Sequence, residues 1–165
     1  MKSIEDAIAE KLYEIINLTL SKIIIPDIKL EDVTQLDEEM IASLKEKYGI
    51  EGIILDVDET IRKNMNKIPK CNREWIESLN GLLKVIIVSN GRDLSIQEYF
   101  KQQGIDYIGF ACKPLKRNFV KACEKMNIEP EKVLVVGNDL FYDIYGGKRN
   151  NMKTALVKNV IDSER

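Results

Sequence analysis

The chain has 165 residues, 44% of them hydrophobic, and a formal net charge of −2. This length is enough to bury one sizeable core, so we expect a single folded domain with at most a small appendage. Duplex nucleic acid takes a dense stripe of Lys and Arg, which this composition does not offer, and we expect no nucleic-acid partner. Residues 1–50 hold 6 basic and 11 acidic side chains, whereas residues 51–165 hold 19 and 16. The mildly basic body is better suited to an anionic substrate than to duplex DNA.

The chain has three cysteines, far apart in sequence, and no histidine. Structural zinc and a disulfide framework are therefore excluded as organising features. The first residues, MKSIEDAIAE, lack the charged-then-apolar order of a signal peptide, and no apolar run approaches the roughly 18 residues that span a bilayer. We expect a cytoplasmic protein, with peripheral contact to a membrane as an alternative.

The N-terminal third shows two helical patterns. Apolar residues at helical spacing predict an amphipathic helix over 3–20 with Ser3 as N-cap, and EEMIASLKEKYG predicts a second helix over 37–47. We therefore expect residues 1–49 to form a helical segment that packs on the main domain or mediates contacts. A dimer contact and a membrane-surface helix are the alternatives, and the acidity of the segment argues against the membrane.

From residue 50 to 165 short β-rich runs alternate with helical patterns. The predicted strands are 52–56, 84–89, 106–111, 132–137 and 154–157, and the predicted helices are 72–81, 93–103, 115–127 and 140–150. This alternation is typical of a three-layer α/β/α fold with a mostly parallel sheet covered on both faces. In such sheets ligands bind outside the carboxyl ends of the strands.

Polar residues stand at each of these strand ends. They are Asp56 and Asp58, then Ser89 and Asn90, then Lys113, and finally Asn138 and Asp139 with Asp143 close behind. Carboxylate and amide oxygens suit Mg²⁺, and a carboxylate can attack phosphorus to give an aspartyl-phosphate. A second aspartate on the same side can move protons, while a lysine and a hydroxyl hold phosphoryl oxygens. The pattern predicts phosphoryl transfer.

Four short motifs carry a resemblance to a known family. DVDET at 56–60, VSN at 88–90, KP at 113–114 and VGNDLFYD at 136–143 resemble the motifs of the haloacid dehalogenase superfamily of phosphohydrolases. More narrowly, IIIPDIKLEDV and GGKRNNMKTALV are similar to the YqeG-like branch of subfamily IIIA, which includes phosphatidylglycerophosphate phosphatases. The resemblance implies a Rossmann-like fold, a Mg²⁺ cofactor and a phosphate-ester substrate.

The same resemblance implies roles for individual residues. Asp56 is the expected nucleophile and Asp58 the acid and base, while Ser89 and Lys113 bind phosphate. Asp139 or Asp143 supplies the metal carboxylate, with Asn138 as a neutral alternative because this chain has Gly-Asn-Asp where the branch usually has Gly-Asp. The full set of expected metal ligands is Asp56, Asp58, Asn138, Asp139 and Asp143. The expected substrate-binding residues are Thr60, Asn90, Arg62 and Lys63, with the basic cluster Arg62, Lys63 and Lys67 forming a rim around an anionic substrate.

Each signal also has a plainer interpretation. Asp139 and Asp143 could cap a helix, Ser89 and Asn90 could form a turn, and Lys113 could be a surface lysine. DVDET matches three positions of a calcium loop, but Ile61 and Lys67 stand where that loop takes Gly and Glu. The position of all these residues at strand ends favours the catalytic interpretation.

The spacing between motifs limits the substrate. Only 33 residues separate Asp56 from Ser89 and 24 separate Ser89 from Lys113, so no cap domain fits in either interval. We expect an open site, with either a large or membrane-held substrate or a partner that covers the site. The predicted function is a Mg²⁺-dependent phosphomonoesterase, and the resemblance implies phosphatidylglycerophosphate. The alternatives are a phosphatase of soluble metabolites or of protein and nucleic-acid phosphates, and a catalytically silent binding protein.

Overall fold

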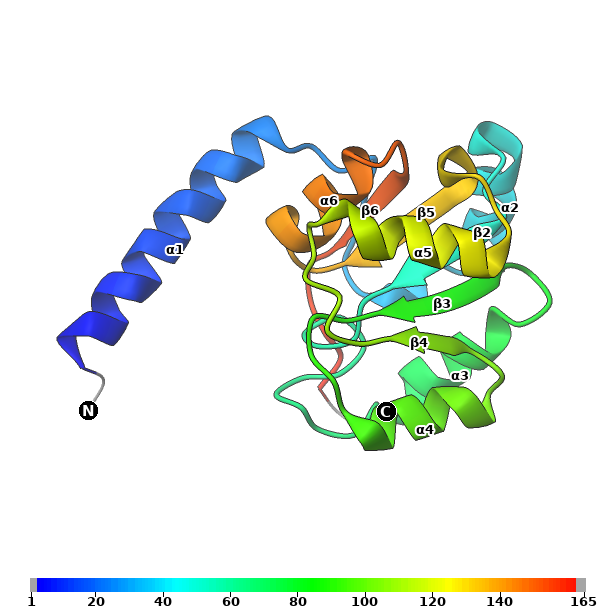
Figure 1. Ribbon diagram of the computed structural model, residues 1–165, viewed down its shortest axis with the longest axis horizontal. Helices are drawn as coiled ribbons and strands as arrows, with labels where there is room; N and C mark the ends of the chain where they lie inside the picture. The colour runs from blue at the N-terminus through cyan, green and yellow to red at the C-terminus, as the bar shows by residue number, and fades with distance from the viewer. Residues whose placement is uncertain (1–2, 163–165) are drawn as a thin grey trace.

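The computed structural model describes residues 3–162, where a long N-terminal helix precedes alternating strands and helices (Figure 1). The described part contains one parallel sheet of six strands in the order β1-β6-β5-β2-β3-β4. The strands are β1 (Ile28–Leu30), β2 (Gly52–Leu55), β3 (Lys84–Val88), β4 (Asp106–Ile108), β5 (Val133–Gly137) and β6 (Lys153–Val157). The α-helices are α1 (Ile4–Ile23), α2 (Glu38–Tyr48), α3 (Lys70–Ser78), α4 (Leu94–Gln102), α5 (Lys116–Met126) and α6 (Gly146–Lys148).

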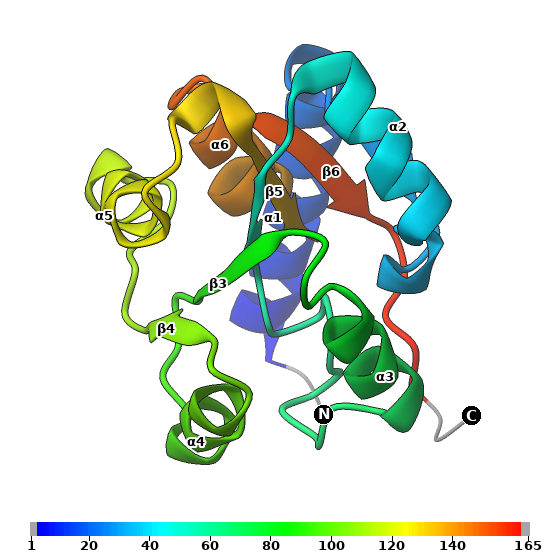
Figure 2. The same cartoon turned by 90° about the vertical axis from the view of Figure 1, so that its right-hand side faces the viewer.

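Helices cover both faces of the sheet (Figure 2). Because side chains alternate along a strand, Ile53 and Leu55 of β2 point to one face while Ile54 points to the other. The first face packs against α2, α3 and α4 through residues such as Trp75 and Phe100. The second packs against α5, where Phe119 is completely buried. The predicted three-layer α/β/α fold is confirmed, and the described sheet is parallel throughout.

The segments between the central strands are as short as the sequence predicts. The stretch from β2 to β3 contains α3, and that from β3 to β4 contains α4. Neither holds a further folded unit, so the prediction of a capless fold is confirmed. The carboxyl edge of the sheet therefore has only loops around it.

The N-terminal segment divides into two parts that the sequence analysis grouped together. Residues 28–30, which we did not predict as a strand, form β1 and pair with β6, and α2 buries Ile41 and Leu44 in the main core. Asp27 fixes this edge, since its Oδ2 accepts hydrogen bonds from the Thr154 amide (2.9 Å) and hydroxyl (3.1 Å). The boundary at residue 49 is thus corrected: the α/β body begins near residue 24.

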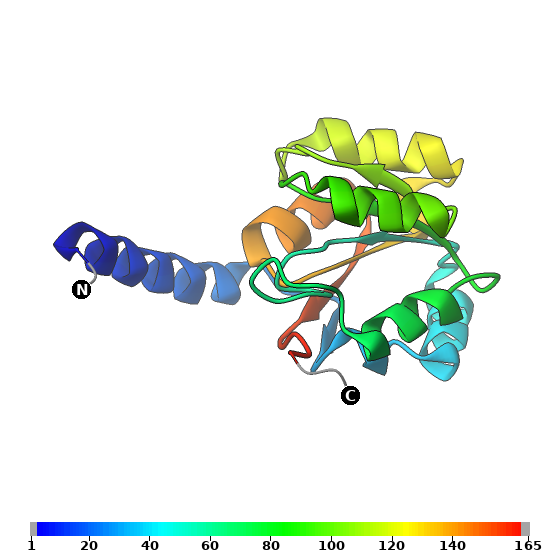
Figure 3. The ribbon, with the colours of Figure 1, turned by 90° about the horizontal axis from the view of Figure 1, so that it is seen from below.

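Helix α1 extends away from this body, on the side of the sheet's carboxyl edge (Figures 1 and 3). It begins at a capping box, in which the Ser3 hydroxyl accepts from the Asp6 amide and the Asp6 carboxylate accepts from the Ser3 amide. No residue of α1 is buried. Its apolar stripe is therefore not packed on the domain, in contrast to the packing we expected for it.

The predicted helix over 140–150 forms with a different geometry at its start. Leu140–Tyr145 is a π-helical turn, here η3, that continues into α6. The amides of Asp143 and Ile144 both donate to the carbonyl of Asp139, at 3.0 and 3.1 Å. This wider turn follows the carboxyl end of β5 directly. Such π-turns are frequent at functional sites.

Candidate active site

The polar strand ends meet at the carboxyl edge of the sheet, as the topology requires. A single buried lysine links three of them: Lys113 Nζ lies 2.7 Å from Asp56 Oδ1 and 2.7 Å from Asp143 Oδ1. The Lys113 side chain is 3% exposed and that of Asp143 is 1% exposed. Burial lowers the pKa of Lys113, but the two carboxylates outweigh it, so the pKa is raised and the lysine stays charged.

Asp143 is held in place from two sides. Its Oδ1 accepts from Lys113, and its Oδ2 accepts from the amide of Asp139 at 3.1 Å. Burial and the negative charge of Asp56 raise the pKa of Asp143, and the ion pair with Lys113 opposes that rise. Gly137 makes this placement sterically possible, because a Cβ there would overlap the Asp143 carboxyl group. The glycine of the fourth motif is thus explained by packing against Asp143.

Asp56 follows β2, and its backbone continues the pairing with β5, since its amide donates to the carbonyl of Val136 at 3.0 Å. Its Oδ2 accepts from the Thr60 hydroxyl at 2.8 Å, and the same hydroxyl lies 3.3 Å from Asn138 Oδ1. Thr60 is buried because the chain turns back tightly after β2, with the amides of residues 60–62 directed to the carbonyl of Val57. Thr60 therefore joins the first and fourth motifs.

Asp58 lies beside this pair and is half-exposed, with 40% of its side chain accessible. Its Oδ1 is 2.7 Å from Nε of Arg62, whose terminal nitrogen is 2.8 Å from Asp93 Oδ2. The hydroxyl of Ser95 and this guanidinium hold the pKa of Asp93 well below its usual range. Arg62 is buried, so the expectation that it stands on an exposed basic rim is wrong. Arg62 can be buried because the carboxylates of Asp58 and Asp93 compensate its charge.

The other substrate-side residues occupy mixed positions. Ser89 is buried at the end of β3. Asn90 is tied to the backbone of Lys113: its Oδ1 accepts from the amide at 2.6 Å, and its Nδ2 donates to the carbonyl at 3.5 Å. Asn90 thus positions the lysine loop. Lys63 is partly exposed and lies 3.1 Å from Asp162, while Lys67 is exposed.

Asp139 caps the π-turn that follows β5. Its Oδ1 accepts from the amides of Phe141 (2.8 Å) and Tyr142 (2.7 Å), and its Oδ2 accepts from the Tyr13 hydroxyl of α1 at 3.1 Å. Asp139 therefore caps the helical turn, as the alternative interpretation of the sequence predicted for it. Asp143 alone carries the buried carboxylate of the fourth motif.

The donors available to a cation are the oxygens around Thr60. Across residues 3–162 no three Asp, Glu, His or Cys side chains gather closely enough to hold a metal ion by themselves. Mg²⁺ usually binds through one or two carboxylates together with water and substrate phosphate. The Asp56 carboxylate and the Asn138 amide oxygen, both near the Thr60 hydroxyl, fit that requirement.

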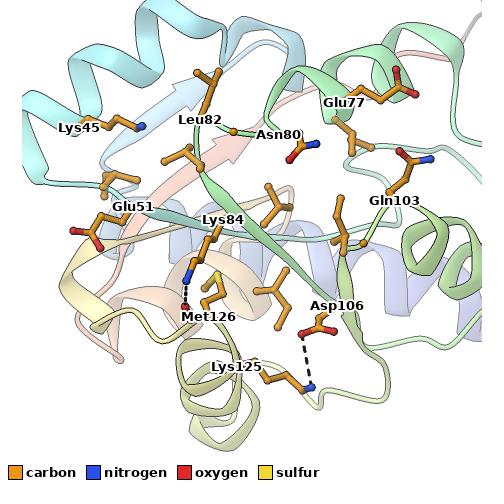
Figure 4. A pocket seen from close by; sticks show the side chains of 18 of the residues that line it. Lys45, Glu51, Glu77, Asn80, Leu82, Lys84, Gln103, Asp106, Lys125 and Met126 are labelled. Carbon is orange, nitrogen blue, oxygen red and sulfur yellow. Dashed lines mark hydrogen bonds and ion pairs between the residues drawn. The ribbon is translucent and has the colours of Figure 1, made fainter.

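A hollow lies at the opposite edge of the sheet (Figure 4). It has a volume of about 830 Å³ and is lined from the amino ends of β2, β3 and β4. Two of its lysines have partners: Lys84 Nζ donates to the carbonyl of Met126 at 2.9 Å, and Lys125 lies 3.8 Å from Asp106. Ligands of open parallel sheets bind at the carboxyl edge. We therefore place the active site around Lys113 and not in this hollow.

Asp93 is the site residue that the sequence analysis missed. It follows Ser89 by four residues and caps α4, where its Oδ1 accepts from the Ser95 amide at 2.9 Å. The pattern indicated the helix start and gave no sign of the ion pair with Arg62. Glu59, which follows the aspartate pair, is exposed, and its carboxylate accepts a hydrogen bond from the Asn64 amide.

The arrangement of a strand-end aspartate pair, a buried lysine and a buried fourth-motif carboxylate on this fold defines a hydrolase class. Residues 37–151 match the family described as haloacid dehalogenase-like hydrolase, and the chain belongs to it. A curated relative is "Probable phosphatase YqeG" of Bacillus subtilis, 32% identical over 148 residues that cover 88% of this chain and 83% of the relative. A glyceraldehyde 3-phosphate phosphatase of Pyrococcus furiosus is 35% identical over 65 residues, which are 39% of this chain and 27% of that protein.

Solved structures share the fold. An uncharacterized protein of Listeria monocytogenes superposes with a TM-score of 0.55 at 21% identity, covering 70% of this chain and 84% of that one. A hypothetical protein of Xanthomonas campestris gives 0.55 at 14% identity, covering 79% and 74%. Across residues 3–162, every helix falls short of the length and apolarity that a bilayer crossing demands.

Proposed function

We propose that the chain is a Mg²⁺-dependent phosphomonoesterase that works through an aspartyl-phosphate on Asp56. The observation that carries the proposal is the buried lysine bridge, in which Lys113 Nζ is 2.7 Å from both Asp56 and Asp143. A charged lysine fixed at a strand end beside the proposed nucleophile can donate hydrogen bonds to the oxygens of a phosphoryl group. The similarity to a probable phosphatase over most of the chain supports the same reaction.

In the first step an Asp56 oxygen attacks the phosphorus of the ester. The bond from phosphorus to the alcohol oxygen breaks, and Asp58, protonated at this stage, gives its proton to the leaving alcohol. In the second step Asp58, now ionised, takes a proton from water while the water oxygen attacks the phosphorus, which releases phosphate and restores Asp56. Asp58 suits this role because it is half-exposed and only one of its oxygens is held by Arg62.

The remaining residues bind and orient the phosphoryl group. Lys113 and the Ser89 hydroxyl would contact its oxygens, and Asp143 would hold the lysine in position through the 2.7 Å ion pair. Asp56 and Asn138 would hold Mg²⁺. When bound, the metal would offset the negative charge that the phosphoryl oxygens carry during transfer.

The substrate is proposed to be a phosphomonoester on a large or membrane-held molecule. The capless fold supports this, because no domain encloses the carboxyl edge and a small substrate would remain open to water. The resemblance to the YqeG-like branch makes phosphatidylglycerophosphate the first substrate to test.

The test is phosphate release by the purified chain with and without Mg²⁺, from phosphatidylglycerophosphate vesicles and from a panel of soluble esters. Asp56→Asn is expected to abolish turnover while leaving the fold intact, because the amide cannot act as the nucleophile. Asp162→Asn makes the same chemical change at an exposed surface carboxylate and should be fully active. Turnover in Asp56→Asn equal to that of the wild type would refute the mechanism.

A further inference from the structure

The exposed apolar side chains of the molecule are distributed on one side. In the described part of the chain, the large apolar residues that are strongly exposed lie on α1 and its link, or in the loops and first helical turns that follow the carboxyl ends of strands. The residues of these loops and turns are Met65, Leu94, Phe110, Leu115, Phe141 and Tyr142. They follow β2, β3, β4 and β5, the strands that also supply the active site. We call these six side chains the apolar ring.

The apolar ring differs from the scattered apolar residues that any protein surface contains. Single exposed apolar side chains are normal on a soluble protein, but they are expected on all faces. Here the opposite, amino edge of the sheet contributes none of them within residues 3–162. Exposed apolar groups that gather on one face mark a surface that contacts another molecule.

Basic side chains lie in the same loops and first helical turns as the apolar ring, and one follows α6. These exposed or partly exposed cations are Lys63, Lys67, Arg92, Lys116, Arg117 and, after α6, Arg149. The Arg149 guanidinium also lies over the aromatic side chain of Tyr145, 5.6 Å from the centroid of its six-membered ring. The exposed or partly exposed acids of the same segments are Asp58, Glu59, Asp93 and Asp139, so the six cations outnumber them.

We propose that this edge docks on a lipid surface that carries anionic headgroups, with the apolar ring entering the interface and the basic residues contacting the headgroups. The proposal rests on the proposed function, because it would bring a membrane-held phosphate to Asp56. Aromatic and aliphatic side chains interspersed with Lys and Arg match the boundary between acyl chains and charged headgroups. A second copy of the chain is the alternative occupant that the test distinguishes.

A second copy of the chain fits this edge less well than a lipid surface does. A two-fold interface sets the same patch of each copy against the other. The basic side chains beside the ring would then face identical basic side chains, whereas an anionic lipid surface is complementary to them.

Helix α1 is compatible with the same surface. Its isoleucines at 4, 8 and 15 share one side of the helix, Asp6 and Glu10 lie on the opposite side, and Glu5 and Glu14 lie on the flanks between them. The hydrogen bond from Tyr13 to Asp139 ties the helix to the edge of the active site. The acidic row can therefore face water while the isoleucine row faces lipid.

The experiment is cosedimentation of the full chain with vesicles of phosphatidylcholine alone and of equal parts phosphatidylcholine and phosphatidylglycerol. The charge variant is Lys116→Glu with Arg117→Glu, in the first turn of α5, where acids are favourable for the helix. Each basic residue near an anionic surface contributes about 1 kcal/mol to the free energy of binding, so the loss of two basic residues should lower the partition coefficient about 30-fold. Lys121→Glu with Lys125→Glu makes the same charge change farther along α5 and should bind like the wild type.

The apolar variant is Leu94→Ser with Leu115→Ser. Leu115 is the N-cap of α5 and Leu94 the first residue of α4, positions that accept serine without loss of the helix. We expect weaker binding to the mixed vesicles and wild-type hydrolysis of the soluble ester p-nitrophenyl phosphate. Equal vesicle binding by the charge variant, the apolar variant and the wild type would overturn the proposal. A dimer that forms without lipid and dissociates in the apolar variant would overturn it in favour of a second copy.

The two proposals fail in different ways. If the wild type hydrolyses p-nitrophenyl phosphate but does not bind the mixed vesicles, docking is refuted and the phosphatase stands. If it binds them in the predicted, ring-dependent way but hydrolyses no ester, the phosphatase is refuted and the docking surface stands.

Discussion

Replacing Lys113 by methionine tests the centre of the site most directly. The substitution keeps the length of the buried side chain but removes the cation that lies 2.7 Å from both Asp56 and Asp143. At an effective dielectric constant of about 20, one such pair attracts by roughly 6 kcal/mol before the cost of removing its charges from water. Loss of the lysine leaves two carboxylates without that compensation.

We expect the free energy of unfolding to fall by about 3–5 kcal/mol, the usual loss when one member of a buried ion pair is removed. For a domain of this size that corresponds to a fall in Tm of roughly 10 °C. The assay is urea unfolding in EDTA, followed by circular dichroism. Added Mg²⁺ should stabilise Lys113→Met more than the wild type, because a cation bound at Asp56 replaces part of the lost charge.

Two further variants make the test specific. Lys132→Met makes the same substitution at an exposed pair, where Lys132 lies 2.9 Å from Glu51 and the side chains are 49% and 53% exposed. It should cost less than about 1 kcal/mol. Adding Asp143→Asn to Lys113→Met removes one unpaired charge and should recover about 1–2 kcal/mol. If Lys113→Met were no more destabilising than Lys132→Met, the argument from the buried bridge would be wrong.

Two other predictions concern positioning and pH. Arg62→Ala should lower kcat for a soluble ester about 10- to 100-fold with little change in KM, because Arg62 contacts Asp58 and not the phosphate site; a raised KM with normal kcat would instead make it a substrate-binding residue. Asp27→Asn should destabilise by about 1 kcal/mol near pH 7 through the loss of its hydrogen bonds to β6. Burial raises the pKa of Asp27, but these hydrogen bonds and a nearby lysine outweigh it and lower the pKa. The carboxylate therefore stabilises the protein above its ordinary pKa of about 3.9, and urea titrations should show the difference from Asp27→Asn vanishing as the pH falls below that value.

The fold was predictable because its signals are local and repeated. The five predicted strands were found within a few residues of their expected bounds, since each is a short apolar run between turn residues. The strand at residues 28–30 was missed because Leu30 is its only buried residue and Pro26 lies just before it. Its formation depends on pairing with β6, a contact across 127 positions of sequence.

The sequence by itself determined that Asp56, Asp58, Ser89, Lys113 and the fourth-motif acids stand at strand ends, and therefore at one edge of a parallel sheet. Only the tertiary structure decided how their side chains pair. It selected Asp143 over Asp139 as the partner of Lys113, and it buried Arg62 between two carboxylates instead of leaving it on the rim. The hydrophobic pattern of the sequence predicts which residues reach the carboxyl edge of the sheet, because the positions of strand ends depend on the backbone. Ion pairing depends on distances of a few ångströms between loops that are far apart in sequence, and these distances are set when the core packs.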